Sequence, residues 1–265
     1  WGELILPNDL TEINNCTFYG WEITSLEIPE SVTKIGNSAF GYRVYNNPRN
    51  LMEIIIPNSV TEIGEYAFAY CPLADVAMPN GVTKIGPLAF GVCRSLTNIV
   101  IPNSVTHIEE RAFISCISLT EVTIPDSVIE IGDSAFYGCS SLEKITIPEN
   151  VISIGRNAFA FRETNSTQFT HTVKINCHLG SAGVDYSIKN NAPVYIIELG
   201  RTIDNFGDID GDGAVTTLDA RKALRLASAM ETGVNDEMLL LGDLNQSGFF
   251  DIEDANIIIQ RPAGM

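Results

Sequence analysis

Hydrophobic positions recur along the first 162 residues in a fixed order, with a period of 22 to 23 residues. One unit is residues 119–139, Leu-Thr-Glu-Val-Thr-Ile-Pro-Asp-Ser-Val-Ile-Glu-Ile-Gly-Asp-Ser-Ala-Phe-Tyr-Gly-Cys. A period of this length predicts a solenoid, in which every unit stacks on its neighbours. Seven prolines anchor seven units, the first incomplete and the second carrying an insertion at 42–50: Pro7, Pro29, Pro57, Pro79, Pro102, Pro125 and Pro148.

Each unit is predicted to begin with a short strand, after which the chain runs back along a second apolar segment, called here the return limb. Proline ends the strand, because it has no N–H to donate to a neighbouring strand. The strand columns are Leu51, Leu73, Leu96, Leu119 and Leu142, then Ile54, Val76, Ile99, Val122 and Ile145, then Ile56, Met78, Ile101, Ile124 and Ile147. The inward columns of the return limb are Val60, Val82, Val105, Val128 and Val151, with Ile63, Ile85, Ile108, Ile131 and Ile154.

Phenylalanine and cysteine occupy two further columns. Phe68, Phe90, Phe113, Phe136 and Phe159 are expected to stack as an aromatic spine. Cys71, Cys93, Cys116 and Cys139 lie three residues later in each unit, and such repetition favours a core ladder of free thiols over disulfides or catalysis. Trp21, Arg43 and Arg162 replace cysteine in the outer units, and this scheme leaves Cys16 and Cys177 unassigned.

The motif Ile-Pro-x-x-Val-x-x-Ile-Gly-x-x-Ala-Phe resembles the BspA-like leucine-rich repeats of bacterial surface and secreted proteins. The resemblance covers about 160 residues. It implies an α/β-type leucine-rich-repeat solenoid of short parallel strands.

The period ends after residue 162, and residues 163–172 are expected to form a polar loop. Residues 173–177 and 193–197 have strand patterns, and the segment between them predicts a short helix with Ser181 as a possible N-cap. We interpret this segment as a cap, because the last unit would otherwise expose its apolar face. Residues 200–205 are expected to be a short linker. The predicted domains are therefore an array at 1–172, a cap with linker at 173–200 and a third module at 201–265.

Two acidic stretches in the third module have the pattern of twelve-residue calcium loops. In such a loop, oxygens at positions 1, 3, 5, 9 and 12 and the carbonyl of residue 7 surround the ion, and glycine at position 6 permits the turn. The first loop offers Asp208, Asp210, Asp212, the Ala214 carbonyl, Thr216 and Asp219; the second offers Asp243, Asn245, Ser247, the Phe249 carbonyl, Asp251 and Asp254. The sequence therefore predicts two bound calcium ions.

Both loops end in Asp, where a helix-loop-helix sensor usually has Glu. Two Asp-terminated loops 35 residues apart, each followed by one helix-like run, resemble a dockerin, the calcium-folded module that attaches cellulosomal proteins to cohesins. The resemblance covers Phe206 to about Pro262 and implies a small all-α domain with two calcium loop-helix motifs. It also implies a cohesin partner on a scaffoldin or cell surface, an extracellular setting, and contacts at Thr217, Leu218, Lys222, Arg225, Ile252, Glu253, Ile257 and Gln260. Because the two halves differ at these positions, we expect a single binding orientation.

The outward columns of the array strands are expected to form a recognition face for a protein or surface target. They are Glu27, Ile55, Ala77, Val100, Thr123 and Thr146 in one column and Glu53, Asp75, Asn98, Glu121 and Lys144 in another. The columns contain no Trp or Tyr, which disfavours stacking on sugars. The insertion at 42–50 carries two Tyr and two Arg and is a second candidate contact site.

Composition limits the possible partners. The net charge of −17 disfavours nucleic acid and anionic membranes, and no apolar run reaches transmembrane length. Of the three His, His107 occupies a variable position, and the Cys177-His178 pair lacks a third orienting group. No motif for phosphate binding, zinc binding or nucleophilic catalysis is present.

These observations favour a non-catalytic, secreted cellulosomal protein with a repeat array for recognition and a dockerin for attachment. Two alternatives stay open. The chain could be a fragment or subunit of a cellulosomal polysaccharide-degrading or proteolytic enzyme, or an adhesin that uses calcium only for stability.

Overall fold

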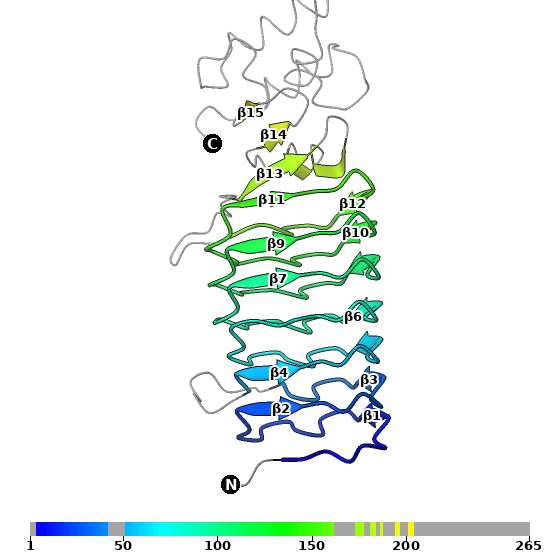
Figure 1. The fold of residues 1–265 in the computed structure, drawn as a ribbon. Coiled ribbons are helices and arrows are strands. Elements are labelled where there is room, and N and C mark those ends of the chain that lie inside the picture. The colour runs from blue at the N-terminus through cyan, green and yellow to red at the C-terminus, as the bar shows by residue number, and fades with distance from the viewer. Residues whose placement is uncertain are drawn as a thin grey trace, which may run out of the picture.

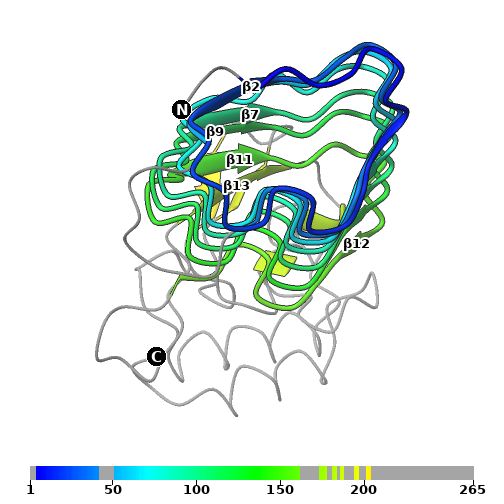
Figure 2. The ribbon, with the colours of Figure 1, turned by 90° about the horizontal axis from the view of Figure 1, so that it is seen from below.

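The repeated units form a stack in the computed structural model, which describes residues 4–41, 51–161, 173–177, 181–183, 186–187, 194–196 and 201–203. Each unit is one flat coil with a two-residue strand on its back side, and five of the seven units also have a three-residue strand on the front side (Figure 1). Seen along the stack, successive units repeat the same outline, each displaced a little from the one before (Figure 2). The predicted solenoid is confirmed, and within 4–41 and 51–161 the segments between strands are turns rather than helices.

The front strands that pair within the array are parallel and in register, β2 with β4 and β7 with β9. In β2, β4, β7 and β11 the middle residue is buried and both flanks are exposed, as alternation along a strand requires. Residues 75–77 of the fourth unit are not assigned as a strand, so β2–β4 and β7–β9 form separate pairs. The front strands of the array are β2 (Ser25–Glu27), β4 (Glu53–Ile55), β7 (Asn98–Val100), β9 (Glu121–Thr123) and β11 (Lys144–Thr146).

The back strands also pair in parallel, in the orders β1-β3-β5-β6 and β8-β10-β12. Each contributes one inward Ile and one outward polar residue. They are β1 (Glu12–Ile13), β3 (Lys34–Ile35), β5 (Glu62–Ile63), β6 (Lys84–Ile85), β8 (His107–Ile108), β10 (Glu130–Ile131) and β12 (Ser153–Ile154).

Charges of opposite sign alternate along the outer side of the first four back strands. Lys34 Nζ lies 3.8 Å from Glu12 Oε1 and 3.6 Å from Glu62 Oε2, and Lys84 Nζ lies 3.2 Å from Glu62 Oε1. The hydrogen bond from Lys84 and the two positive charges lower the pKa of Glu62 against the opposing effect of partial burial. Because these side chains are partly exposed to water, each pair contributes at most about 1 kcal/mol and mainly helps to fix the register.

The aromatic spine is confirmed and extends further than predicted. Phe18 and Phe40 join the five expected rings, and the seven rings stack with centroid separations from 5.2 to 5.6 Å and interplanar angles from 4 to 16°. Two residues before each Phe, the backbone is left-handed, as at Leu88 with φ 53° and Arg111 with φ 56°. The backbone N–H of each of the first six Phe donates to an Ala carbonyl of the following unit, at 2.8 to 2.9 Å.

The cysteine ladder is confirmed as part of the core. Each Sγ donates to a Phe carbonyl of the preceding unit, for example from Cys93 to Phe68 and from Cys116 to Phe90, both at 3.2 Å. Burial raises the pKa of Cys71 to about 12 and also raises the pKa values of Cys93 and Cys139. None of the six cysteines forms a disulfide, and all six lie in the described part of the chain. Burial therefore keeps the thiols of Cys71, Cys93 and Cys139 neutral in the core.

The front sheet continues beyond the array. Strand β13 (Lys174–Cys177) pairs in parallel with β11, then β14 (Val194–Ile196) pairs in parallel with β13, and β15 (Arg201–Ile203) pairs antiparallel with β14. Helical residues at 182–183 and 186–187 lie in the segment expected to be a short helix. The linker predicted at 200–205 is wrong in part, because 201–203 completes the sheet. The flanking residues Gly200, Asp204 and Asn205 are typical of turns, which is why the sequence pattern did not predict this strand.

Among the residues that the structure describes, no helical segment has both the length and the apolarity needed to cross a lipid bilayer.

Candidate recognition face

The exposed face of the front sheet carries the two columns predicted from the sequence. All eleven of their residues are exposed, because the middle residue of each strand turns into the core. Ile5 extends the first column by one unit, since it precedes Pro7 as Ile55 precedes Pro57. Sequence reasoning missed Ile5 because the first unit is incomplete, although its distance from Pro7 was a usable signal.

Four apolar side chains of the first column form what we call the apolar stripe: Ile5, Ile55, Ala77 and Val100. Their branched side chains are among the most exposed apolar groups of the described residues, with exposed fractions of 80% for Ile5, 67% for Ile55 and 60% for Val100. Glu27 is the only polar member between Ile5 and Val100. Apolar residues that recur in one column, rather than scattered singly, are typical of an interaction surface.

Beside the apolar stripe runs a column dominated by acids, which we call the acidic column: Glu53, Asp75, Asn98 and Glu121. Asn98 donates from Nδ2 to Asp75 Oδ1 at 2.6 Å, which aligns neighbouring members. Lys144, in the seventh unit, is the first cation along this column. The face is therefore apolar and acidic over its N-terminal units, and basic only toward its C-terminal end.

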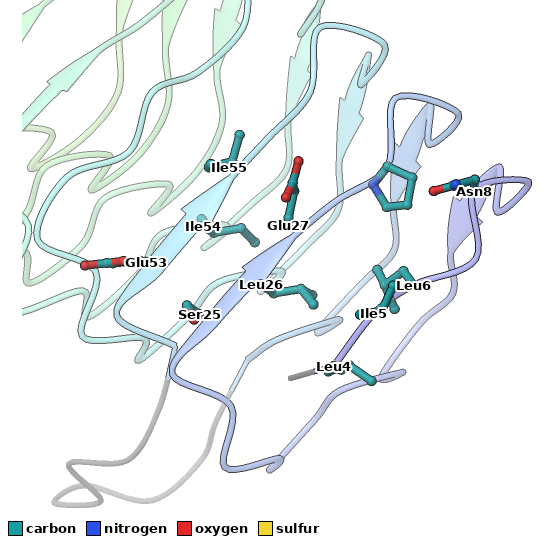
Figure 3. A pocket seen from close by; sticks show the side chains of 11 residues that line it. Leu4, Ile5, Leu6, Asn8, Ser25, Leu26, Glu27, Glu53, Ile54 and Ile55 are labelled. Carbon is teal, nitrogen blue, oxygen red and sulfur yellow. The ribbon is translucent and has the colours of Figure 1, made fainter. Parts of the chain in front are cut away.

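A hollow of about 350 Å³ opens on the N-terminal part of this face. Figure 3 shows the side chains around it, with Ile5 and Ile55 on either side of Glu27 and with Glu53 on the neighbouring column. Leu26 belongs to the same lining and is buried, so the lining combines apolar side chains with the acidic residues Glu27 and Glu53.

The structure describes only some of the other candidate sites. His107 is exposed, with Nδ1 2.9 Å from Thr106 Oγ1, as its variable position predicted. Cys177 is buried on β13, whereas His178 lies outside the described residues. Within the described ranges, no three His, Cys, Asp or Glu side chains group in a way that could hold a metal ion.

The calcium and cohesin sites and the insertion remain predictions. The twelve expected calcium ligands between Asp208 and Asp254, the eight expected cohesin contacts between Thr217 and Gln260, and the insertion at 42–50 all lie outside the described residues.

Comparison with known proteins identifies the repeats. The family profile described as "BspA type Leucine rich repeat region" matches six copies over residues 2–96 and 41–166, which together span more than half of the chain. A comparison with curated proteins finds no relative of this chain.

Solved structures give further similarities. The leucine-rich repeat protein of T. pallidum is 32% identical, with a TM-score of 0.49 over 57% of this chain and 69% of that protein. A leucine-rich cell surface protein of Faecalibacterium prausnitzii is 28% identical, with a TM-score of 0.38 over 63% of this chain and 57% of that protein. The pneumococcal vaccine antigen PcpA is 21% identical, with a TM-score of 0.45 over 71% of this chain and 58% of that protein.

Proposed function

Because the chain belongs to the BspA-type leucine-rich repeat family, we propose that it is a non-catalytic, secreted component whose front sheet recognises a protein or a surface. Proteins of this family are typically surface or extracellular bacterial proteins. The observation that supports recognition most directly is the apolar stripe beside the acidic column, because a purely solvated sheet would have no reason to keep Ile and Val outward in several units.

A comparison of the two sides of the solenoid tests this role. A photoreactive benzoylphenylalanine is placed at Ile55 on the front sheet or at Ile152 on the return limb, which is 78% exposed. On cells of the producing organism, we expect cross-linked products from position 55 and far fewer from position 152. Equal products from the two positions, or none from either, would contradict recognition by the front sheet.

For the C-terminal module, we propose that residues 206–262 fold around two calcium ions as a dockerin and attach the chain to a cohesin of a scaffoldin. The support is the sequence pattern, in which both twelve-residue loops provide an oxygen ligand at every required position. Calcium is expected to act as a folding ligand, because the loop carboxylates repel one another without it and the short helices form only a small core.

The two halves of this module present different contact residues, Thr217 and Leu218 against Ile252 and Glu253. A half-turn of the module would therefore not restore the same surface, and binding is expected in one orientation. The centre of the interface is expected to use Leu218 with Ile252 or Ile257, and Arg225 is expected to be its polar anchor, since interface cores favour apolar and Arg contacts.

The test is a pull-down of the full chain with cohesins of the same organism, in calcium and in chelator. We expect capture only in calcium, weaker capture of the Leu218→Ala/Arg225→Ala variant, and unchanged capture of Ile152→Ala. Unchanged capture of the double variant would remove the assigned contacts. Calcium-dependent folding without capture by any cohesin would instead favour the adhesin alternative.

A further inference from the structure

We propose that the N-terminal half of the front sheet binds an extended protein segment in which basic and apolar side chains alternate. This inference rests on the proposed recognition role of the sheet and names the chemistry of its partner. The binding surface consists of the apolar stripe, the acidic column and the hollow next to Glu27.

The first argument is the geometry of the two columns. Their members are two residues apart on each strand, as Glu53 and Ile55 are on β4, so the columns run about 7 Å apart. The residue between them points into the core, as Ile54 does with 8% exposure, which leaves a furrow between the columns. An extended chain in this furrow would direct alternate side chains to opposite sides, one set toward the apolar stripe and the other toward the carboxylates.

The second argument is length. The apolar stripe runs from Ile5 in the first unit to Val100 in the fifth, four unit spacings of about 4.8 Å and therefore about 19 Å in total. An extended segment of about six residues covers this distance. A short linear segment of a partner protein therefore matches the surface better than a large globular face does.

The third argument is charge. Glu27, Glu53, Asp75 and Glu121 are exposed on the first six units of the face, and these two columns contain no Lys or Arg before Lys144. A Lys or Arg side chain can place its aliphatic stem against exposed Ile side chains while its charged end reaches a carboxylate. Acidic partners and phosphate-bearing surfaces are disfavoured, because like charges placed opposite each other cost affinity.

The hollow provides an anchoring position for one such side chain. Ile5 and Ile55 belong to its lining, with the Glu27 side chain between them, and Glu53 lines it from the neighbouring column (Figure 3). Its volume of about 350 Å³ is at the lower end of the range for ligand pockets, which suits one long side chain better than a large cofactor.

The test uses the full chain and three synthetic hexapeptides, (Lys-Val)₃, (Glu-Val)₃ and (Lys-Gly)₃, with binding followed by fluorescence polarisation. We expect (Lys-Val)₃ to bind most tightly and to lose affinity as salt concentration rises. In the Glu27→Gln/Glu53→Gln variant its affinity should fall about tenfold, since each exposed pair contributes modestly. Ile55→Ala should also weaken binding. The matched controls, Glu130→Gln on the back strands and Ile152→Ala, should bind as the unaltered chain does.

Two results would overturn the inference, and they differ in what they mean for the recognition role. If (Glu-Val)₃ binds as tightly as (Lys-Val)₃ and Ile55→Ala weakens both, the sheet recognises peptides but the basic partner is wrong. If the front variants and the two controls bind (Lys-Val)₃ equally, or none of the peptides binds, the inference fails. The cross-linking comparison of positions 55 and 152 then decides separately whether the sheet recognises anything.

Discussion

The hydroxyl of Tyr186 accepts a hydrogen bond from the backbone N–H of Phe159 at 3.0 Å. In the preceding units this N–H meets an Ala carbonyl of the next unit, as Phe136 meets Ala158 at 2.8 Å. No further repeat unit follows Phe159. Tyr186 replaces both the carbonyl that would accept the hydrogen bond and the ring that would pack on Phe159. Its ring meets that of Phe159 edge-on at 5.4 Å, and burial raises the pKa of its hydroxyl. Tyr186 thus ends the aromatic spine and satisfies its last donor.

Tyr186→Phe should keep the ring contact but leave the Phe159 N–H without its acceptor. An unsatisfied buried donor costs about 1–3 kcal/mol, so we expect a corresponding loss in the free energy of unfolding, measured by urea titration. Amide exchange at Phe159 should accelerate more than at Phe113, whose N–H bonds to Ala135. Tyr19→Phe, at an exposed tyrosine, is the control and should change stability little. An equal loss in both variants would contradict the capping role.

The thiol ladder predicts a loss of stability in alkali. The folded pKa values of Cys71, Cys93 and Cys139 lie above their unfolded values because of burial, so the folded state holds protons that the unfolded chain releases. The stabilisation is fully present below about pH 8.5 and is lost as pH rises toward the folded pKa, which for Cys71 is about 12. Cys71, Cys93 and Cys139 each contribute a slope of up to about 1.4 kcal/mol per pH unit in this window.

Urea titrations between pH 7 and pH 10.5 measure this slope. Cys93→Ala should be less stable at pH 7 because it leaves a cavity, but its stability should fall less steeply with pH. Cys16→Ala, at an exposed cysteine, should keep the slope of the unaltered chain. If Cys93→Ala leaves the slope of stability against pH unchanged, the thiol ladder does not cause the loss of stability in alkali.

The array could be predicted from the sequence because its columns repeat. One position that is apolar in every unit has a single structural explanation, and this fixed the inward side of the strands, the stacking of Phe113 on Phe136 and the burial of Cys116. Parts that occur once carry no such internal comparison. Tyr186 could not be recognised as the end of the spine, because its partner Phe159 is 27 residues away and nothing local marks the contact.

The recognition face was predictable in its members but not in its shape. Alternation along each strand placed Ile55 and Glu53 outward, and both are exposed. The hollow depends on how Ile5 of the incomplete first unit lies against Glu27 and Ile55, which requires three-dimensional packing. The left-handed backbone at Val92 could not be predicted from the sequence either. The equivalent positions in other units carry Gly20 and Gly138 but also Tyr70 and Ser115, so glycine does not mark this conformation consistently.

Val92 adopts φ 62°, which is unfavourable for a β-branched residue, and two equivalent positions carry glycine. Val92→Gly should relieve about 1–2 kcal/mol of backbone strain and lose about 0.5–1 kcal/mol to the greater freedom of glycine in the unfolded chain. We therefore expect a gain of about 0–1.5 kcal/mol in the free energy of unfolding. Val100→Gly, which deletes the same side chain from strand β7, should destabilise instead, and destabilisation by both changes would contradict the strain argument.

Removal of calcium should unfold the C-terminal module and leave the repeat array folded. The core from Leu6 to Phe159 is built from apolar side chains, whereas every predicted calcium ligand lies between Asp208 and Asp254. In EDTA, limited proteolysis followed by mass spectrometry should therefore give cuts beyond residue 203 and leave the array intact, and calcium should suppress those cuts by folding the loops. Asp208→Ala/Asp243→Ala should be cut in the same region even with calcium present. Equal protection with and without the ion would remove calcium from the folding of this module.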